Sequence, residues 1–224
     1  MRIGRKPIGT VAYLGGLPSV IEEFCWSWAQ MVQYNSEYMV NEAGVVHYDR
    51  TKVSLQYVSR NTLADRFLGD WLLMIDTDHA FDPDILMRLL RKMEQYKVDV
   101  LSALYQSRWE PHQPVMYKWR VGRFEPIALW ELDPGEELLP VDSVGAGTLL
   151  IKRNVFDRIS KELSDQPFDI IPPWGEDHSF FRRLMRLGIK VYVDPGIQSY
   201  HLATKPIDLS YYNPDSIEGV SING

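Results

Sequence analysis

The feature that most constrains the fold is the apolar run WLLMI at residues 71–75, which ends directly in Asp76, Thr77 and Asp78. A strand that is apolar at every position has both of its faces covered, so this run predicts a central strand in a sheet with helices on each side. The two aspartates therefore lie at the end of a buried strand.

Strand and helix patterns alternate along the first half of the chain. Strand patterns lie at residues 11–16, 45–50, 53–58, 71–75 and 98–105, and helix patterns lie at residues 18–32, 61–69 and 83–93. This alternation predicts an α/β fold with a mostly parallel sheet that helices cover on both faces. Farther along, residues 114–130 predict a hairpin or irregular strands, and residues 176–188 predict a helix that ends at Gly188.

Composition excludes some classes of partner. The formal net charge is −6, and because nucleic-acid binding needs a basic surface, we expect no nucleic-acid partner. The longest apolar run is too short to span a bilayer, and residues 1–10 lack the apolar stretch of a signal peptide. We therefore expect a cytoplasmic protein without a transmembrane segment. The single cysteine, Cys25, lies between Phe24 and Trp26 in a helical pattern, which predicts a buried thiol.

Asp76 and Asp78 are two residues apart, so in an extended strand their carboxylates leave the same face and can meet one ion. In open α/β sheets the ligand crevice lies at the carboxyl ends of the strands, which is where this pair falls. Oxygen ligands suit Mg²⁺ or Mn²⁺, and such an ion would neutralise a departing diphosphate. The alternative is that these acids only begin a loop, as we expect of Asp82 and Asp84 at the start of the next helix.

Several residues near these strand ends suit a nucleotide-sugar donor. Leu14, Gly15 and Gly16 lie between the first strand and the first helix, where glycine lets the backbone approach a ligand closely, although Gly-Gly is also an ordinary turn. Arg108 follows the strand that ends at Tyr105 and is a candidate for diphosphate contact, or a surface arginine.

A second group suits an acceptor sugar. Gly145, Ala146 and Gly147 leave room for a sugar against the backbone, whereas strand glycines otherwise mark bulges. Trp174 stands immediately before Gly175 and an acidic pair, where it can stack on an acceptor or fold into the core. Both interpretations of Trp174 remain open.

Three blocks of the sequence resemble GT-A glycosyltransferases similar to family 2. They are SRNTLADRFLGDWLLMIDTDHAFDPDIL from residue 59, VGAGTLLIKRNVFDRI from residue 144 and WGEDHSFFRRLMRLGIKVYVDPGIQSYHL from residue 174. Together they span residues 59–202, more than half of the chain, in the family's order. The resemblance implies the GT-A three-layer α/β/α sandwich with a mostly parallel central sheet, and transfer from a nucleoside-diphosphate sugar, UDP- or GDP-linked, to a hydroxyl of a sugar or other acceptor.

The resemblance also implies roles for single residues. Asp177 would be the general base of an inverting transfer, with Glu176 orienting or replacing it. Because Asp177 lies in the first turn of a helix, its pKa should be low. His201 would be a third metal ligand and would shift the preference from Mg²⁺ toward Mn²⁺. Arg60 would contact the nucleotide, with Asn61 beside it at a helix start, although helix capping explains Asn61 equally well.

The other histidines receive the simpler interpretation of exposed or hydrogen-bonded side chains; they are His47, His79, His112 and His178. Thr77, between the two aspartates, joins the donor-site candidates.

The sequence departs from the family in two places. The acidic run that helps to bind base and ribose is reduced to Asp49 and Thr51 in HYDRTK, which leaves the base open. The Gln-x-x-Arg-Trp motif of processive synthases is absent, so we expect the transfer of single sugars.

We expect one GT-A domain over residues 1–201 and a tail at 202–224 that is a lid or a flexible segment. Two other functions compete with transfer. One is a sugar-nucleotide pyrophosphorylase, which needs a basic glycine-rich loop that GGLPSVIEE does not provide. The other is a non-catalytic sugar-binding domain of the same fold.

Overall fold

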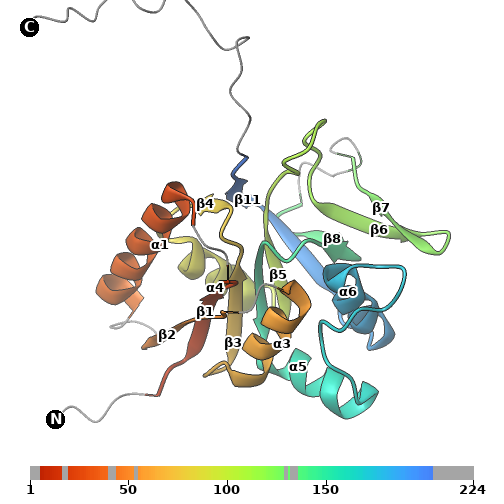
Figure 1. The fold of residues 1–224 in the computed structure, drawn as a ribbon, viewed down its shortest axis with the longest axis horizontal. Helices are drawn as coiled ribbons and strands as arrows, with labels where there is room; N and C mark the ends of the chain where they lie inside the picture. Colours follow the sequence, from red (N-terminus) through yellow and green to blue (C-terminus); the bar gives the residue numbers. More distant parts are fainter. Residues whose placement is uncertain are drawn as a thin grey trace, which may run out of the picture.

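The frame of the structure is a large central sheet (Figure 1). The structure is a computed structural model, and it describes residues 6–16, 20–39, 44–52, 55–128, 131 and 136–203. The strands follow the order β2 (Val46–Arg50), β1 (Gly9–Tyr13), β3 (Trp71–Ile75), β10 (Thr148–Lys152), β5 (Val100–Leu104), β11 (Val191–His201) and β4 (His79–Phe81), with β8 (Leu139–Val141) against β11.

The sheet is mostly parallel. Strand β1 runs parallel to β2 and β3, and β5 runs parallel to β11. Strand β10 lies antiparallel between β3 and β5, so those two strands point the same way. The carboxyl ends of β1, β3 and β5 therefore share one edge, where ligand crevices of such sheets lie.

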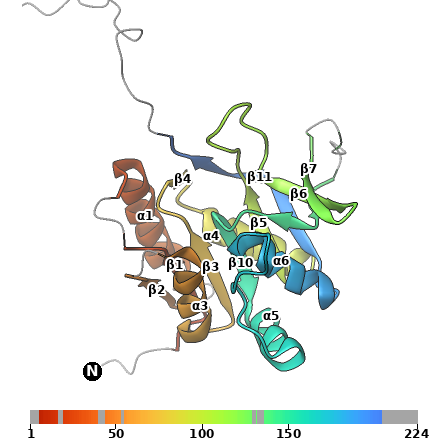
Figure 2. The same cartoon turned by 45° about the vertical axis from the view of Figure 1, so that its right-hand side comes forward.

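Helices cover both faces of the sheet (Figure 2). They are α1 (Glu22–Tyr34), α3 (Gln56–Arg66), α4 (Ile85–Gln95), α5 (Arg153–Arg158) and α6 (Glu176–Arg186), with π-helical turns η1 (Asn35–Met39) after α1 and η3 (Ile159–Leu163) after α5. In β3, Leu72 and Met74 join the core formed with α3, α5 and α6, and Leu73 and Ile75 join the core formed with α1 and α4. The alternation explains why every residue of β3 is apolar, and it confirms the predicted three-layer α/β/α sandwich.

A small antiparallel sheet stands beside the main one, formed by β7 (Arg123–Pro126), β6 (Met116–Arg120) and β9 (Ser143–Val144) (Figure 1). It confirms the hairpin predicted for this region. Strand β9 packs near α6. Because Asp177 at the start of α6 and Asp76 after β3 line the same cavity, the small sheet lies close to the edge where β3 ends.

Three local predictions were wrong. Residues 56–58, which were expected in a strand, belong to α3 (Gln56–Arg66), and Arg60 and Asn61 lie inside that helix and not at its start. Cys25 is exposed, because the register of α1 turns Phe24 and Met31 toward the core and the thiol outward. Asp84 stands at the N-cap position of α4 without a side-chain capping bond; it pairs with Arg88.

Among the described residues, no helix is both long and apolar enough to cross a membrane. The predicted lid or flexible tail lies almost wholly outside the described residues, which end at 203.

Candidate active site

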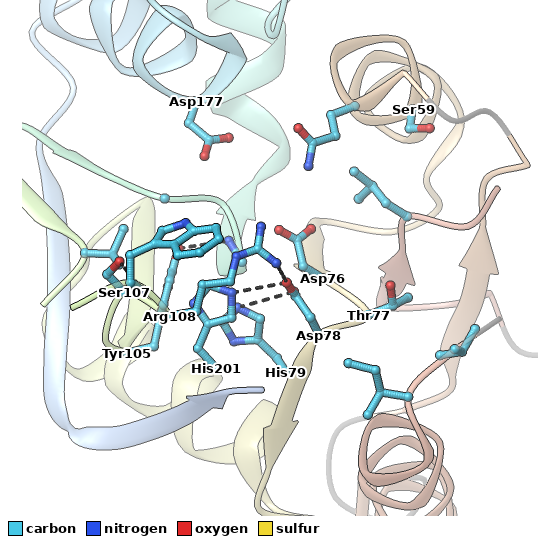
Figure 3. Close-up of a pocket in the computed structure, with 18 of the residues that line it drawn as sticks. Ser59, Asp76, Thr77, Asp78, His79, Tyr105, Ser107, Arg108, Asp177 and His201 are labelled. Carbon is cyan, nitrogen blue, oxygen red and sulfur yellow. Dashed lines mark hydrogen bonds and ion pairs between the residues drawn. The ribbon is translucent and has the colours of Figure 1, made fainter. Parts of the chain in front are cut away.

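A cavity of about 740 Å³ opens at the carboxyl ends of β1, β3 and β5 (Figure 3). Leu14 and Gly15 line it after β1, Asp76, Thr77 and Asp78 line it after β3, and Tyr105, Ser107 and Arg108 line it after β5. Asp177 and His201 reach the same cavity from α6 and β11. The central sheet thus gathers side chains that are far apart in the sequence.

Arg60 lies beneath this cavity and connects its two sides. The side chain is 1% exposed, and one terminal nitrogen donates to both carboxylate oxygens of Asp76 at 3.1 Å. The other terminal nitrogen donates to the carbonyl of Ala146, and Nε lies 3.6 Å from carboxylate oxygens of both Glu176 and Asp177. Burial lowers the pKa of Arg60, but the three carboxylates raise it by more, so the guanidinium stays charged.

Asp177 stands in the first turn of α6, and the amide of Ala146 donates to its Oδ2 at 3.2 Å. Burial raises the pKa of Asp177 to about 7, against the lowering effect of Arg60, and the charges of Glu176 and Asp76 raise it further. The predicted low pKa was wrong, because desolvation and two neighbouring acids outweigh the helix N-terminus. In Figure 3 the Asp177 carboxylate, from α6, and the Asp76 carboxylate, which follows β3, both lie among the residues that line the cavity.

Asp78, His79 and His201 form a compact cluster, in which one ligand atom of each lies within 4.8 Å of the others. His201 Nε2 lies 3.1 Å from Asp78 Oδ2, and His79 Nε2 lies 4.0 Å from Asp78 Oδ1. The two imidazole rings stack with centroids 4.7 Å apart, because β4 and β11 pair these residues in register. The cluster is therefore fixed by the backbone of two strands.

The far nitrogen of each imidazole is also held. His79 Nδ1 lies 2.8 Å from the hydroxyl of Ser199, and His201 Nδ1 donates to the carbonyl of Gln106 at 3.0 Å. Burial lowers the pKa of His79 to about 4, so this ring is neutral at neutral pH. The hydrogen bond to Asp78 raises the pKa of His201. In protein metal sites, a ligating histidine holds one ring nitrogen in a hydrogen bond and presents the other to the ion. Here Nδ1 of each histidine is the nitrogen that is held, and Nε2 faces Asp78.

Gly147 leaves the space in which the His79 ring lies. A Cβ atom on Gly147 would come 2.5 Å from His79 Nε2, which is far inside van der Waals contact. Tyr105 occupies the neighbouring space, and its hydroxyl accepts a hydrogen bond from the Gly147 amide. The glycines of this segment therefore make room for His79 and Tyr105, in addition to any room they leave for a sugar.

The structure brings most of the predicted site residues together. Those that line the cavity are Leu14, Gly15, Asp76, Thr77, Asp78, Arg108, Gly145, Gly147, Asp177 and His201. Arg108 donates to Asp78 Oδ2 at 3.1 Å. Glu176 contacts Arg60 and lines a smaller adjoining cavity, and Ala146 contributes its backbone.

Other predicted residues lie elsewhere. Asp49 forms a two-pronged ion pair with Arg66 at 2.7 and 2.8 Å and does not line the cavity, and neither does Gly16. Arg60 is buried below the cavity and does not line it. Trp174 packs edge-on against Trp119, with ring centroids 5.6 Å apart.

Sequence reasoning missed His79, Tyr105, Trp109 and Tyr117, all of which line the cavity. His79 directly follows Asp78, and Tyr105 ends a strand whose neighbour ends in the two aspartates, so position along the sheet edge was the available signal. Trp109 and Tyr117 carry no such signal, because a loop and a hairpin bring them to the site.

The model of Glycosyl transferase family 2 matches residues 29–159 of the chain. Among solved structures, A197 from STIV is similar with a TM-score of 0.56 and 16% identity, over 87% of this chain and 86% of that one. GalNAc-T7, crystallised with UDP, GalNAc and Mn²⁺, is similar with a TM-score of 0.59 and 12% identity, over 88% of this chain and 44% of that one. These likenesses show the GT-A fold. No curated protein sequence matches significantly.

Proposed function

The chain belongs to glycosyl transferase family 2, and from that premise we propose that it transfers a single sugar from a nucleoside-diphosphate sugar to an acceptor hydroxyl. We propose that the transfer requires a divalent metal ion and inverts the anomeric carbon. The observation that carries the proposal is that one cavity holds the Asp78–His79–His201 cluster together with the Asp177 carboxylate.

The cluster suits a divalent cation. Asp78 offers a carboxylate oxygen, and His79 and His201 each offer Nε2 while Nδ1 is anchored. A mixed nitrogen and oxygen donor set favours Mn²⁺ over Mg²⁺. Asp76 remains a candidate ligand, because carboxylate oxygens that accept from Arg60 keep further lone pairs. When bound, the ion would act as a Lewis acid toward the diphosphate leaving group.

The donor side of the proposal uses the part of the cavity near β1 and α3. Leu14, Gly15 and Thr77 line that part and suit contact with a UDP- or GDP-linked sugar. Arg108 is 47% exposed, with its guanidinium on Asp78, so it can turn to a diphosphate oxygen without leaving the site. Arg60 does not line the cavity, so we assign it no direct contact with the donor; it holds the Asp76 carboxylate in place.

On the acceptor side, Asp177 takes the proton of the attacking hydroxyl. As that proton moves to Asp177, the acceptor oxygen forms a bond to the anomeric carbon, and the bond from that carbon to the diphosphate oxygen breaks with its electron pair leaving on the diphosphate. A base with a pKa of about 7 is matched to catalysis near neutral pH. Glu176 shares Arg60 with Asp177 and orients the pair.

A thermal-shift titration tests the proposal. We expect Mn²⁺ together with one nucleotide from UDP, GDP, CDP and dTDP to stabilise the protein by about 2.7 kcal/mol at one hundred times its dissociation constant. Asp78→Ala should abolish this shift. Asp82→Ala is the matched control, because Asp82 lies nearby but pairs with Arg88 outside the cavity.

The same titration, with the matching nucleoside triphosphates added to the panel, separates the competing functions. Stabilisation by a nucleoside triphosphate in preference to every diphosphate would favour the pyrophosphorylase. No nucleotide effect, with or without Mn²⁺, would contradict transfer and favour a non-catalytic sugar-binding domain.

A further inference from the structure

The main cavity continues on the side away from β1. Two smaller cavities of about 150 Å³ each adjoin it, and both share Val115 and Tyr117 with the main cavity. One of them also contains Trp109, and the other contains Glu176 and Asp177. Tyr117 therefore stands between an exposed tryptophan and the proposed base.

The loop that carries Trp109 is held by its backbone. The amide of Val115 donates to the carbonyl of Tyr105, the amide of Ser107 donates to the carbonyl of Gln113, and the amide of Trp109 donates to the Ser107 hydroxyl. These bonds fix the chain on both sides of Trp109, so the position of its Cα is determined.

The indole of Trp109 is nevertheless left open. The residue is 73% exposed, and the guanidinium of Arg108 lies 5.7 Å from the ring centroid. A fixed backbone with an uncovered indole at the rim of two connected cavities presents a flat aromatic face to a ligand.

Trp174, for which acceptor stacking and core packing were both predicted, packs against other aromatic side chains. Its ring contacts Trp119 and Phe124, and the Arg182 guanidinium lies 5.3 Å from it. It lines none of the cavities described above. Trp109 and Tyr117, in contrast, line the continuous space that ends at Asp177.

We propose that Trp109 and Tyr117 form the acceptor platform and that the acceptor is a saccharide. A pyranose ring has faces of C–H groups that suit an aromatic surface, and a rim of hydroxyls that suits the nearby carboxylates of Glu176 and Asp177. Each of the two smaller cavities, at about 150 Å³, offers room for one ring beside Tyr117. This inference rests on the proposed transfer function.

Saturation-transfer NMR on the intact protein tests the platform, with methyl glucopyranosides, galactopyranosides and mannopyranosides as probes. We expect at least one pyranoside to receive saturation on its ring C–H protons. Trp109→Ala should weaken that binding about tenfold, which corresponds to about 1.4 kcal/mol, and Trp109→Phe should retain most of it. The matched control is Trp26→Ala, which removes another exposed tryptophan, on α1 and outside the cavity.

The outcomes are distinguishable from those of the proposed function. If no pyranoside binds, or if Trp109→Ala binds as well as the intact protein, the platform is overturned. It is also overturned if a serine- or threonine-containing peptide binds and the pyranosides do not. Nucleotide and Mn²⁺ titrations on the same samples report the transfer function separately, so either proposal can fail alone. Because the indole is exposed, Trp109→Ala should fold, and its thermal midpoint checks that it does.

Discussion

Arg60 and Asp76 form an ion pair in which one nitrogen of the buried guanidinium donates to both oxygens of the half-buried carboxylate at 3.1 Å. Arg60 comes from α3 and Asp76 follows β3, while the rest of the guanidinium faces Glu176 and Asp177 at the start of α6. One arginine therefore fixes the distance between the proposed donor and acceptor sides. Its planar shape matters, because a lysine cannot reach three carboxylates and the Ala146 carbonyl at once.

We expect Arg60→Lys to lower the free energy of unfolding by about 3 kcal/mol, because the lysine ammonium can pair with only part of this group and leaves the other carboxylates without a partner. Urea unfolding measures this change. Arg66→Lys is the matched control on the same helix, since Arg66 is 46% exposed in its pair with Asp49, and we expect it to cost less than about 1 kcal/mol. Equal costs for the two variants would contradict the role assigned to Arg60.

Asp177→Asn should stabilise the protein at alkaline pH. The folded pKa of about 7 lies above the ordinary aspartate value of 3.8, so the stability contributed by protonated Asp177 is present below about pH 4 and is lost as the pH rises through 7. The full difference in pKa corresponds to about 4 kcal/mol. Because the side chain is 30% exposed, we expect about 2 kcal/mol between pH 4 and pH 8.

Urea unfolding of both proteins at pH 4, 6 and 8 measures this difference. The advantage of Asp177→Asn should grow at each step. An advantage that is constant or shrinks with pH would show that Asp177 is not protonated in the folded protein.

Much of the fold could be predicted because the apolar pattern of β3 can be read directly from five consecutive residues. A five-residue strand that is apolar throughout needs two covered faces, and that requirement alone predicts the three layers. The start of α3 was mispredicted because Val58 and its neighbours suit either a strand or a helix over a short window. Tertiary packing decides between them, and packing is not visible in a local pattern.

The site was less predictable because its properties come from contacts between distant segments. In the sequence, His79 looks like an ordinary histidine. Its role depends on His201, which lies 122 residues later in the chain and which β11 brings onto the His79 ring. The pKa of Asp177 rises because a buried helix start loses solvent, which the residue's position in the helix does not reveal. Likewise, only packing separates the covered Trp174 from the open Trp109.

We expect the kcat/KM for sugar transfer to rise with pH and to level off above about pH 7, because Asp177 must lose its proton before it can act as the base. Asp177→Asn should lower the rate by about a hundredfold or more and remove this rise. Initial rates from pH 5.5 to 8.5 at saturating Mn²⁺ measure both effects. A rise that persists in Asp177→Asn would assign the titration to another group and leave Asp177 without the role of base.

Gly147→Ala should damage the metal cluster directly. The added Cβ would lie 2.5 Å from His79 Nε2, so the imidazole has to leave its place beside Asp78, and the overpacking should cost about 1–3 kcal/mol of stability. Thermal shifts with Mn²⁺ alone report whether the ion still binds, and we expect most of that stabilisation to disappear. Gly175→Ala is the control, because a Cβ there meets nothing within 4 Å and φ is −70°. If Gly147→Ala kept the full Mn²⁺ shift while Asp78→Ala lost it, His79 would be removed from the ligand set and the ion would rest on Asp78 with His201 and Asp76.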